Sequence, residues 1–373
     1  MHDIHEVAGG PVAEMLNAMN AGVYLTDRDR RIVFWNRQAE RITGHRAEDV
    51  VGSRCRDGIL EHVDKDGHPL CSTDLCPLYR AMNADRPSQR PVVVYARTAS
   101  GKRIPVSTSV APIHDEEGNV IGGVEVFQDE SENMRELEEA KAVQLEMLPK
   151  DLPDNESVSF ALEYVPAEYV GGDFCHIQDL SGGVYNVLVA DVAGHGTASA
   201  LYTAILHSLV DECAESMASP SAFMSELNDR VCARAPHSRL VTAFTANFDC
   251  SGKRMVYCSA GIPPALVQPP GGGRVAQLEL MNYPLGVENG VDFDSAEHPL
   301  QSGDRVLVYT DGAVELRTDE TNRLQVAGLV EVLDGCPPQG SDHHLGELYS
   351  ALLERCVTTL PEDDILLLSC IIW

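Results

Sequence analysis

The feature that most constrains the fold is a stretch without glycine or proline. Residues 130–148 are rich in glutamate, alanine, leucine, methionine and lysine, which favour helix, and Pro149 ends the run. This helix separates two longer segments that both contain strand-like runs. The sequence therefore predicts three parts: a domain at 12–129, a helical linker at 130–150 and a second domain at 151–373.

One face of the predicted linker helix carries side chains at helical spacing, namely Leu137, Ala140, Gln144 and Met147. Two interpretations stay open. The helix could pack on its own domains, or it could form a short dimeric coiled coil that transmits a signal, although coiled coils normally need three or four heptads. The second interpretation predicts a homodimer.

The segment 12–129 has the pattern of a small α+β domain. Residues 22–27 and 31–36 form two strand-like runs around a turn, and polar helical stretches follow. This order predicts an α+β fold of the size of a sensor domain. Three more strand-like runs complete the segment, at 92–98, 104–112 and 120–128.

The segment 151–373 alternates strand-like runs with turns rich in glycine, proline and aspartate. Two helical stretches, 197–212 and 221–234, interrupt the strands. This composition predicts a core of sheet packed on sheet with helices outside it. The strand-like runs are 185–192, 241–249, 255–259, 305–310 and 365–372.

Charge is unevenly divided along the chain. Residues 151–373 carry 10 Lys and Arg against 32 Asp and Glu, a net charge of −22. Such a domain repels phosphate backbones, so nucleic acid is not an expected partner, whereas divalent cations favour carboxylates. The chain has no signal-peptide pattern at its start, no apolar stretch long enough to span a membrane, and eleven cysteines typical of reduced thiols. We therefore expect a cytoplasmic protein without a membrane partner.

Four aspartates of the second domain stand where strand-like runs begin or end, each beside glycine or another acid: Asp173, Asp191, Asp311 and Asp363. A carboxylate beside glycine can bring its oxygens and its backbone close to an ion. One such aspartate is usually a turn residue. Four from distant segments could converge at one edge of a sandwich and hold two divalent cations, which can activate a water and hold a phosphoryl oxygen.

Six motifs of the second domain occur in the order found in one enzyme family. With them, the segment resembles the metal-dependent protein phosphatases, the PPM family, in the bacterial branch of sporulation and stress sigma-factor regulators. The resemblance implies an α-β-β-α sandwich with two Mn²⁺ or Mg²⁺ ions that hydrolyses phosphoserine or phosphothreonine. The motifs are Gly-Gly-Asp-Phe (171–174), Asp-Val-Ala-Gly-His-Gly (191–196), Ser-Ala-Gly-Ile-Pro-Pro (259–264), Pro-Leu-Gly-Val (284–287), Tyr-Thr-Asp-Gly-Ala-Val-Glu (309–315) and Asp-Asp-Ile (363–365).

The same resemblance implies roles for individual residues. Asp191 would bridge both metal ions, and the Val192 carbonyl would add a ligand. Asp173, Asp311 and Asp363 would complete the coordination, and Asp191 and Asp311 would be the catalytic residues. The implied substrate is a phosphorylated anti-sigma-factor antagonist in a partner-switching pathway.

Three positions depart from the family pattern: His176 stands for an aspartate, Ile262 for a histidine and Leu366 for a threonine. None of them is an implied metal ligand. Two alternatives to an active phosphatase stay open. One is a catalytically weak phosphatase-like module that acts by binding a protein, and the other is a scaffold whose carboxylates only bind structural cations.

The first domain resembles a PAS domain. Residues 25–27, 32–40 and 48–52 are similar to its first half, and residues 101–106 and 112–122 to its second half. PAS domains imply sensing or dimerisation rather than catalysis.

Five soft or borderline metal ligands cluster within this domain: Cys55, His62, His68, Cys71 and Cys76. They could hold a metal ion, an iron–sulfur cluster or another sensor ligand. The alternative is three small core residues and two loop histidines, because the Cys-x-x-Cys pair that structural zinc sites normally show is missing.

Overall fold

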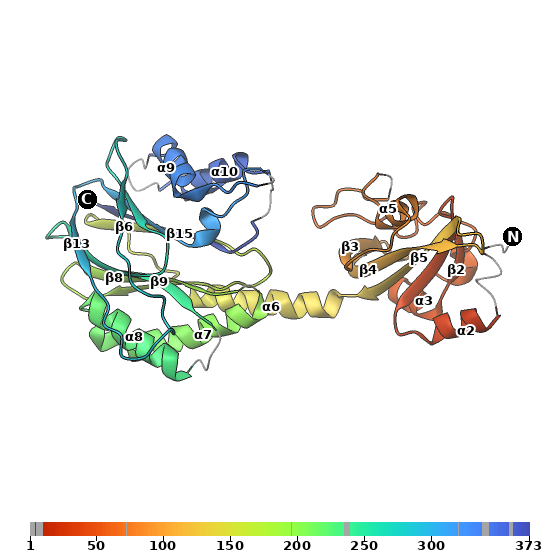
Figure 1. Ribbon diagram of the computed structural model, residues 1–373, viewed down its shortest axis with the longest axis horizontal. Coiled ribbons are helices and arrows are strands. Elements are labelled where there is room, and N and C mark those ends of the chain that lie inside the picture. The colour runs from red at the N-terminus through yellow and green to blue at the C-terminus, as the bar shows by residue number, and fades with distance from the viewer. Residues whose placement is uncertain are drawn as a thin grey trace. The chain divides into compact units, whose positions relative to one another are not determined.

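The computed structural model describes residue 4 and residues 10–71, 73–194, 196–234, 239–319, 321–337, 343–357 and 361–373. The chain divides into two compact units, Met1–Glu136 and Leu137–Trp373, called here the N-terminal and the C-terminal unit. Figure 1 labels their helices and strands.

The N-terminal unit is built on one antiparallel sheet of five strands in the order β2-β1-β5-β4-β3. The inner face of the sheet packs against short helices and buries Tyr24, Trp35 and Phe127 in one core. The predicted early hairpin and late strands are confirmed. The elements are α2 (Gly10–Ala18), β1 (Gly22–Asp27), β2 (Ile32–Trp35), α3 (Arg37–Thr43), α4 (Ala47–Val50), α5 (Pro77–Ala84), β3 (Val92–Arg97), β4 (Arg103–His114) and β5 (Val120–Asp129).

Asn36 fixes the start of this unit. Its side-chain oxygen accepts hydrogen bonds from the backbone N–H of Ala39, which caps α3, and of Val23 on β1. Its amide nitrogen donates to the carbonyls of Leu16 and Ala21. One buried side chain therefore joins the end of α2, the first strand and the first helix after the hairpin.

The C-terminal unit is a sandwich of two antiparallel five-stranded sheets. Their orders are β13-β10-β9-β8-β7 and β12-β11-β14-β15-β6. The strands are β6 (Val158–Val165), β7 (Asp173–Asp179), β8 (Val184–Val192), β9 (Val241–Asp249), β10 (Arg254–Ala260), β11 (Ala265–Gln268), β12 (Ala276–Leu278), β13 (Ala296–Pro299), β14 (Arg305–Tyr309) and β15 (Ile365–Ile372).

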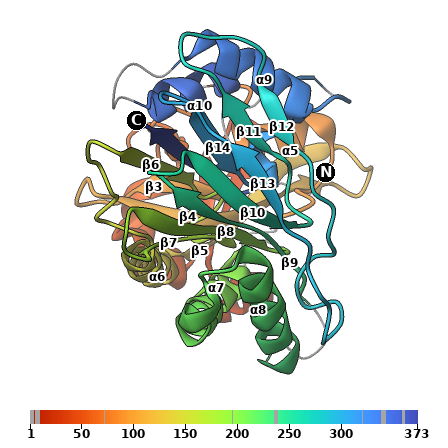
Figure 2. The same cartoon turned by 90° about the vertical axis from the view of Figure 1, so that its left-hand side faces the viewer.

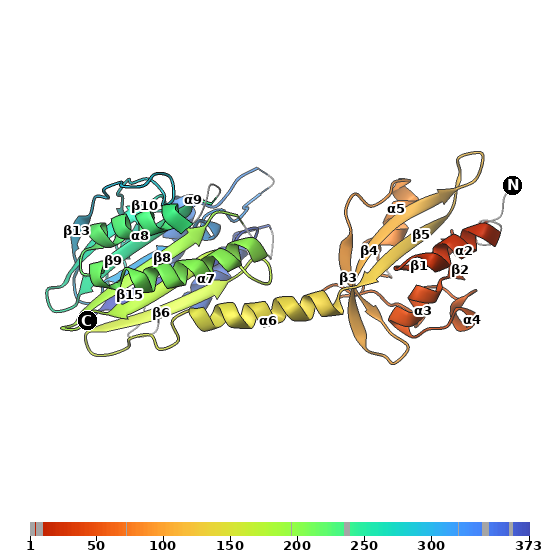
Figure 3. The ribbon, with the colours of Figure 1, turned by 90° about the horizontal axis from the view of Figure 1, so that it is seen from below.

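Helices cover both outer faces of the sandwich, as Figure 2 shows. Helices α7 (Thr197–Glu212) and α8 (Pro220–Arg234), with the short η1 (Ala214–Ser216), pack on the first sheet and lie side by side in Figure 3. The strand-and-helix pattern predicted these two helices. It missed α9 (Gln325–Gly335) and α10 (Leu345–Glu354), which bury the outer face of the second sheet around Tyr309 and Leu367.

The predicted linker helix is confirmed as α6 (Ser131–Met147). The division between the two units falls inside this helix. Of its residues, all described, only Gln144 is buried, and its side chain bonds to groups of its own chain. The last turns of α6 therefore pack on the C-terminal unit. No helix in the described ranges combines the length and apolar character needed to cross a bilayer.

Candidate metal centre

Two of the predicted aspartates face each other across neighbouring strands. Asp173 opens β7, Asp191 lies near the end of β8, and the two are paired in the antiparallel register. Phe174, the next residue, packs among the helices on the outer face, whereas Cys175 lies in the core between the sheets. Because side chains alternate along a strand, Asp173 projects to the same inner side as Cys175.

The other two aspartates come from the second sheet. Asp311 begins the short η2 (Asp311–Ala313), two residues after β14, and Asp363 lies two residues before β15. The Thr310 hydroxyl, beside Asp311, donates a hydrogen bond of 2.8 Å to Asp173 Oδ2. This bond crosses from one sheet to the other, so the ends of β7, β8, β14 and β15 meet at one edge of the sandwich.

Glycines leave room for this convergence. A Cβ atom at Gly172 would lie 2.7 Å from the Val192 carbonyl oxygen and 3.3 Å from Asp191 Oδ1. At Gly312, a Cβ atom would collide with the carbonyl oxygen of Asp364. The sequence therefore needs glycine at both places for the carboxylates and the Val192 carbonyl to approach one another.

Crowding of carboxylates gives the site an unusual electrostatic character. Burial, together with the negative charges of Asp311 and Asp363, raises the pKa of Asp191 to about 7. Burial and the nearby Asp191 raise the pKa of Asp173 well above its usual range, and burial raises that of Asp311. A positive charge bound among these groups would relieve both burial and repulsion.

The residues present fit a divalent cation. The donors are carboxylate oxygens and one backbone carbonyl, which hard cations such as Mg²⁺ and Mn²⁺ prefer. Glycine at position 172 keeps the space beside the Val192 carbonyl oxygen free of a Cβ atom. The carboxylates are not drawn tightly together, because no three of them in the described chain bring one oxygen each within 4.8 Å of one another.

Three contributors to this site were not among the predicted residues. Asp364, beside the predicted Asp363, is buried and accepts hydrogen bonds from the backbone N–H of Ala167 and of Gly172. Thr310 and Gln144 also hold groups of the site. The motifs already contained Asp364 and Thr310, but nothing in the sequence indicated which of their neighbours they would bond.

The three departures from the family pattern lie outside the four aspartates. His176 is on the outer face of β7, where burial lowers its pKa and where Asp211 and His207 of α7 are its titratable neighbours. Ile262 and Leu366 are buried in the core between the sheets. His195, in the motif that follows Asp191, lies outside the described residues.

Four of the five candidate sensor ligands are buried, but no three of them in the described chain bring one ligand atom each within 4.8 Å of one another. Cys55, Cys71, Cys76 and His62 are buried, and the backbone N–H of His62 donates to Cys71 Sγ at 3.0 Å. An interaction with the Cys71 thiol lowers the pKa of Cys76. His62 Nε2 lies 3.7 Å from Glu125 Oε1, and the Tyr24 hydroxyl donates to the same carboxylate.

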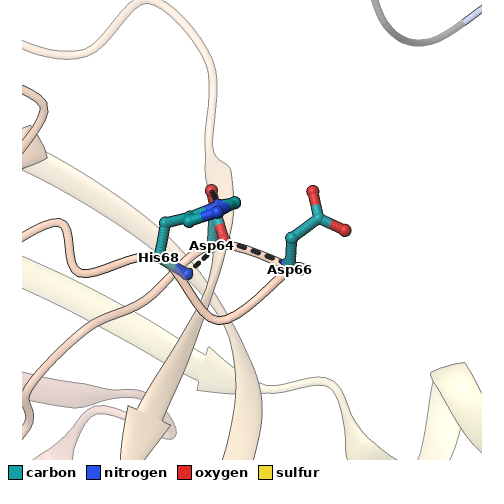
Figure 4. Close-up of side chains that lie close together, drawn as sticks. All are labelled: Asp64, Asp66 and His68. Atoms are coloured by element: carbon teal, nitrogen blue, oxygen red, sulfur yellow. Dashed lines mark hydrogen bonds and ion pairs between the residues drawn. The ribbon is translucent and has the colours of Figure 1, made fainter.

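His68, the fifth candidate, does not join this cluster. It lies in an exposed loop with Asp64 and Asp66, and among the described residues these three alone form a group whose ligand atoms all lie within 4.8 Å of one another. Asp64 accepts hydrogen bonds from the backbone N–H of Asp66 and His68, and its other oxygen meets the His68 ring (Figure 4). These bonds are those of an aspartate that closes a turn.

Comparisons with known proteins match both units. Residues 181–371 match the family "Stage II sporulation protein E (SpoIIE)", and residues 20–132 match the PAS domain. The chain is 27% identical over 229 residues to the phosphoserine phosphatase RsbU of Bacillus subtilis, covering 61% of this chain and 68% of RsbU. It is 29% identical over 185 residues to the phosphoserine phosphatase RsbP of the same organism, covering 48% of this chain and 45% of RsbP, so less than half of RsbP is spanned.

A solved structure supports the fold. The SiaA-PP2C domain of Pseudomonas aeruginosa superimposes with a TM-score of 0.58 at 21% sequence identity, covering 65% of this chain and 97% of that domain. At this identity the likeness concerns the fold alone. The expected α+β class, with a PAS domain followed by a phosphatase-type sandwich, is confirmed.

Proposed function

The chain belongs to the Stage II sporulation protein E family, and we propose that its C-terminal unit is a divalent-metal-dependent phosphatase that hydrolyses phosphoserine or phosphothreonine in a protein. The observation that carries this proposal is the convergence of Asp173, Asp191 and Asp311 at one edge of the sandwich, where their pKa values are all raised. Carboxylates crowded in this way suit a site for cations rather than a set of turn residues.

The proposed ligands are the four aspartates and one backbone carbonyl. Asp191, opposite Asp173 in the sheet, would contact both ions, and the Val192 carbonyl would add a ligand. Asp173, Asp311 and Asp363 would complete the coordination, with Asp191 and Asp311 as the catalytic residues. Mn²⁺ or Mg²⁺ bound there would supply Lewis-acid activation of water and charge stabilisation at the phosphoryl oxygens.

The chain's own residues prepare the site for this chemistry. Thr310 holds one oxygen of Asp173, which leaves the other oxygen available to a cation. The carboxylates repel a phosphate dianion until cations neutralise them, so substrate binding should depend on metal. Because this domain is acidic, it repels long polyanions. We therefore expect a phosphoprotein substrate whose phosphate group is the part that contacts the site.

The proposed substrate is a phosphorylated anti-sigma-factor antagonist. RsbU and RsbP, the relatives matched, are named phosphoserine phosphatases. We propose that this chain acts on the same class of small phosphoprotein in a partner-switching pathway, in the cytoplasm.

For the N-terminal unit we propose regulation of the phosphatase. Its PAS domain, residues 12–129 in the proposed division, would sense a stimulus and form a homodimer, and residues 130–150 would connect it to the catalytic domain at 151–373. The buried cluster of Cys55, Cys71, Cys76 and His62 is the proposed place for a metal, an iron–sulfur cluster or another ligand. His68 is not part of that proposal, because it lies in the Asp64 turn.

The proposed activity can be tested on the full chain. Release of phosphate from a phosphoserine protein should require Mn²⁺ or Mg²⁺, stop with a chelator and return when metal is added. Substrates phosphorylated on tyrosine alone should react far more slowly. A full chain that binds Mn²⁺ but releases no phosphate from any phosphoprotein would contradict the proposal.

A further inference from the structure

A polar side chain from the linker helix is buried against the start of the strand that carries Asp173. Gln144 is 7% exposed. An amide is costly to bury unless its donors and acceptor are bonded. An apolar side chain at this position would be enough to pack α6 on the C-terminal unit. The presence of an amide therefore needs another reason, which its hydrogen bonds supply.

The amide of Gln144 holds one glycine from both sides. Its nitrogen donates to the Gly171 carbonyl at 2.6 Å, and its oxygen accepts from the Gly171 N–H at 3.0 Å. The same nitrogen lies 3.3 Å from the Thr203 hydroxyl of α7. One side chain therefore joins the linker helix, the segment before β7 and helix α7.

The glycine held in this way lies against the candidate metal centre. A Cβ atom at Gly171 would collide with the Asp364 carboxylate. The next residue, Gly172, donates its N–H to Asp364 Oδ2 at 2.6 Å and accepts at its carbonyl from the Val192 N–H at 3.1 Å. The residue after that is Asp173. Three consecutive residues thus connect the Gln144 amide to Asp364, to Val192 and to the first carboxylate of the site.

We propose that Gln144 is a positioning residue for the metal centre, which is incomplete without the last turns of α6. This inference rests on the proposed function. Gln144 touches no predicted ligand directly and acts through Gly171. It also lies upstream of the stretch, 181–371, that matches the family. A movement of α6 away from Gly171 would remove the bonds of Gln144 to that residue and loosen the Gly171–Asp173 segment. The linker helix is therefore physically connected to the metal centre.

The test uses the full chain and the variants Gln144→Ala and Gln144→Met. The methionine variant keeps nearly the size of the side chain but removes both the N–H donor and the acceptor without adding a charge. Val143→Ala, at an exposed position of the same helix, is the control. Partners that orient metal ligands typically change metal affinity by about 10–100-fold when removed. Calorimetric titration with Mn²⁺ should show a loss in this range for both Gln144 variants and none for Val143→Ala.

A second measurement needs no metal. Hydrogen exchange at the Gly171 and Gly172 amides of the metal-free chain should become at least tenfold faster in both Gln144 variants, while the central strands keep their protection. Unchanged Mn²⁺ affinity or unchanged exchange at these amides, in a variant with a native circular dichroism spectrum, would overturn the inference. If Gln144→Ala does not fold, the methionine variant decides the matter. Failure of the unmodified chain to bind Mn²⁺ would instead contradict the proposed function. The exchange measurement on the metal-free chain would then still test whether Gln144 holds Gly171.

Discussion

Asp173 and Asp191 lie directly opposite each other across strands β7 and β8. Two carboxylates in this arrangement repel each other, and the charge of Asp191 adds to burial in raising the pKa of Asp173. A single hydroxyl, that of Thr310, holds Asp173 from the opposite sheet. The pair is therefore kept together by the fold and not by any attraction between the two side chains.

The first prediction concerns activity. Asp191→Asn and Asp311→Asn should each lower the metal-dependent phosphatase rate by at least about a thousandfold, because each removes a charged ligand that the cations need. Asp211→Asn makes the same chemical change at an exposed position of α7 and should leave the rate within about twofold. Near-normal turnover in Asp311→Asn would remove that residue from the site.

The second prediction separates two neighbouring aspartates. Asp364→Asn should lower the free energy of unfolding by about 1–3 kcal/mol, because one amide N–H would then face the backbone N–H of Ala167 or of Gly172. Asp363→Asn should lose activity with little change in stability. Urea denaturation and phosphate release measure the two effects. Equal stability losses in the two variants would be incompatible with these roles.

The third prediction concerns pH in the metal-free protein. Burial and neighbouring carboxylates raise the pKa of Asp191 to about 7 in the folded state, against about 4 in an unfolded chain. The folded state then binds this proton more tightly, so the stabilising contribution is complete below about pH 4 and is lost as the pH rises through about 7.

This sign can be measured by thermal denaturation in the presence of a chelator. Lowering the pH from 7.5 to 5.5 should shift the melting temperature further in favour of the folded state in the unmodified chain than in Asp191→Asn. Excess Mg²⁺ should reduce this shift, because the cation competes with protons for the same carboxylates. The same pH dependence in both proteins would show that Asp191 titrates normally.

The fourth prediction concerns the sensor cluster. If Cys55, Cys71 and Cys76 hold a metal, protein purified without oxygen should contain iron or zinc in a fixed ratio to chain, and Cys76→Ser should lose it. Cys232→Ser, on α8 of the other unit, is the matched control. Elemental analysis gives the ratio, and metal-free protein of normal stability would mean that these thiols only pack the core.

The fifth prediction concerns the linker. The full chain should sediment as a dimer through its PAS domain and α6. Four residues inserted after Glu139 add about 40° of rotation at 3.6 residues per turn, so regulation by the N-terminal unit should be lost while both units stay folded. A monomer at assay concentration, or unaltered regulation, would count against a dimeric linker.

Local patterns determined much of this protein. Alternating apolar residues encode strands, and the run without glycine or proline encodes α6, because these preferences act over a few neighbouring residues. The same reasoning placed Asp173, Asp191, Asp311 and Asp363 at strand ends. It missed α9 and α10, since their burial depends on a sheet face that only the packed sandwich presents.

Only the tertiary structure decided how the site is held. The bond between Thr310 and Asp173 joins residues 137 positions apart, and that between Asp364 and Gly172 joins residues 192 positions apart. Gln144 looked like one side chain of a helix face and is in fact a bonded amide against Gly171. Likewise, His68 was near the cysteines in sequence but lies in a separate turn. Spacing along the chain specifies which residues an element exposes, whereas the register and packing of two sheets specify which of them meet.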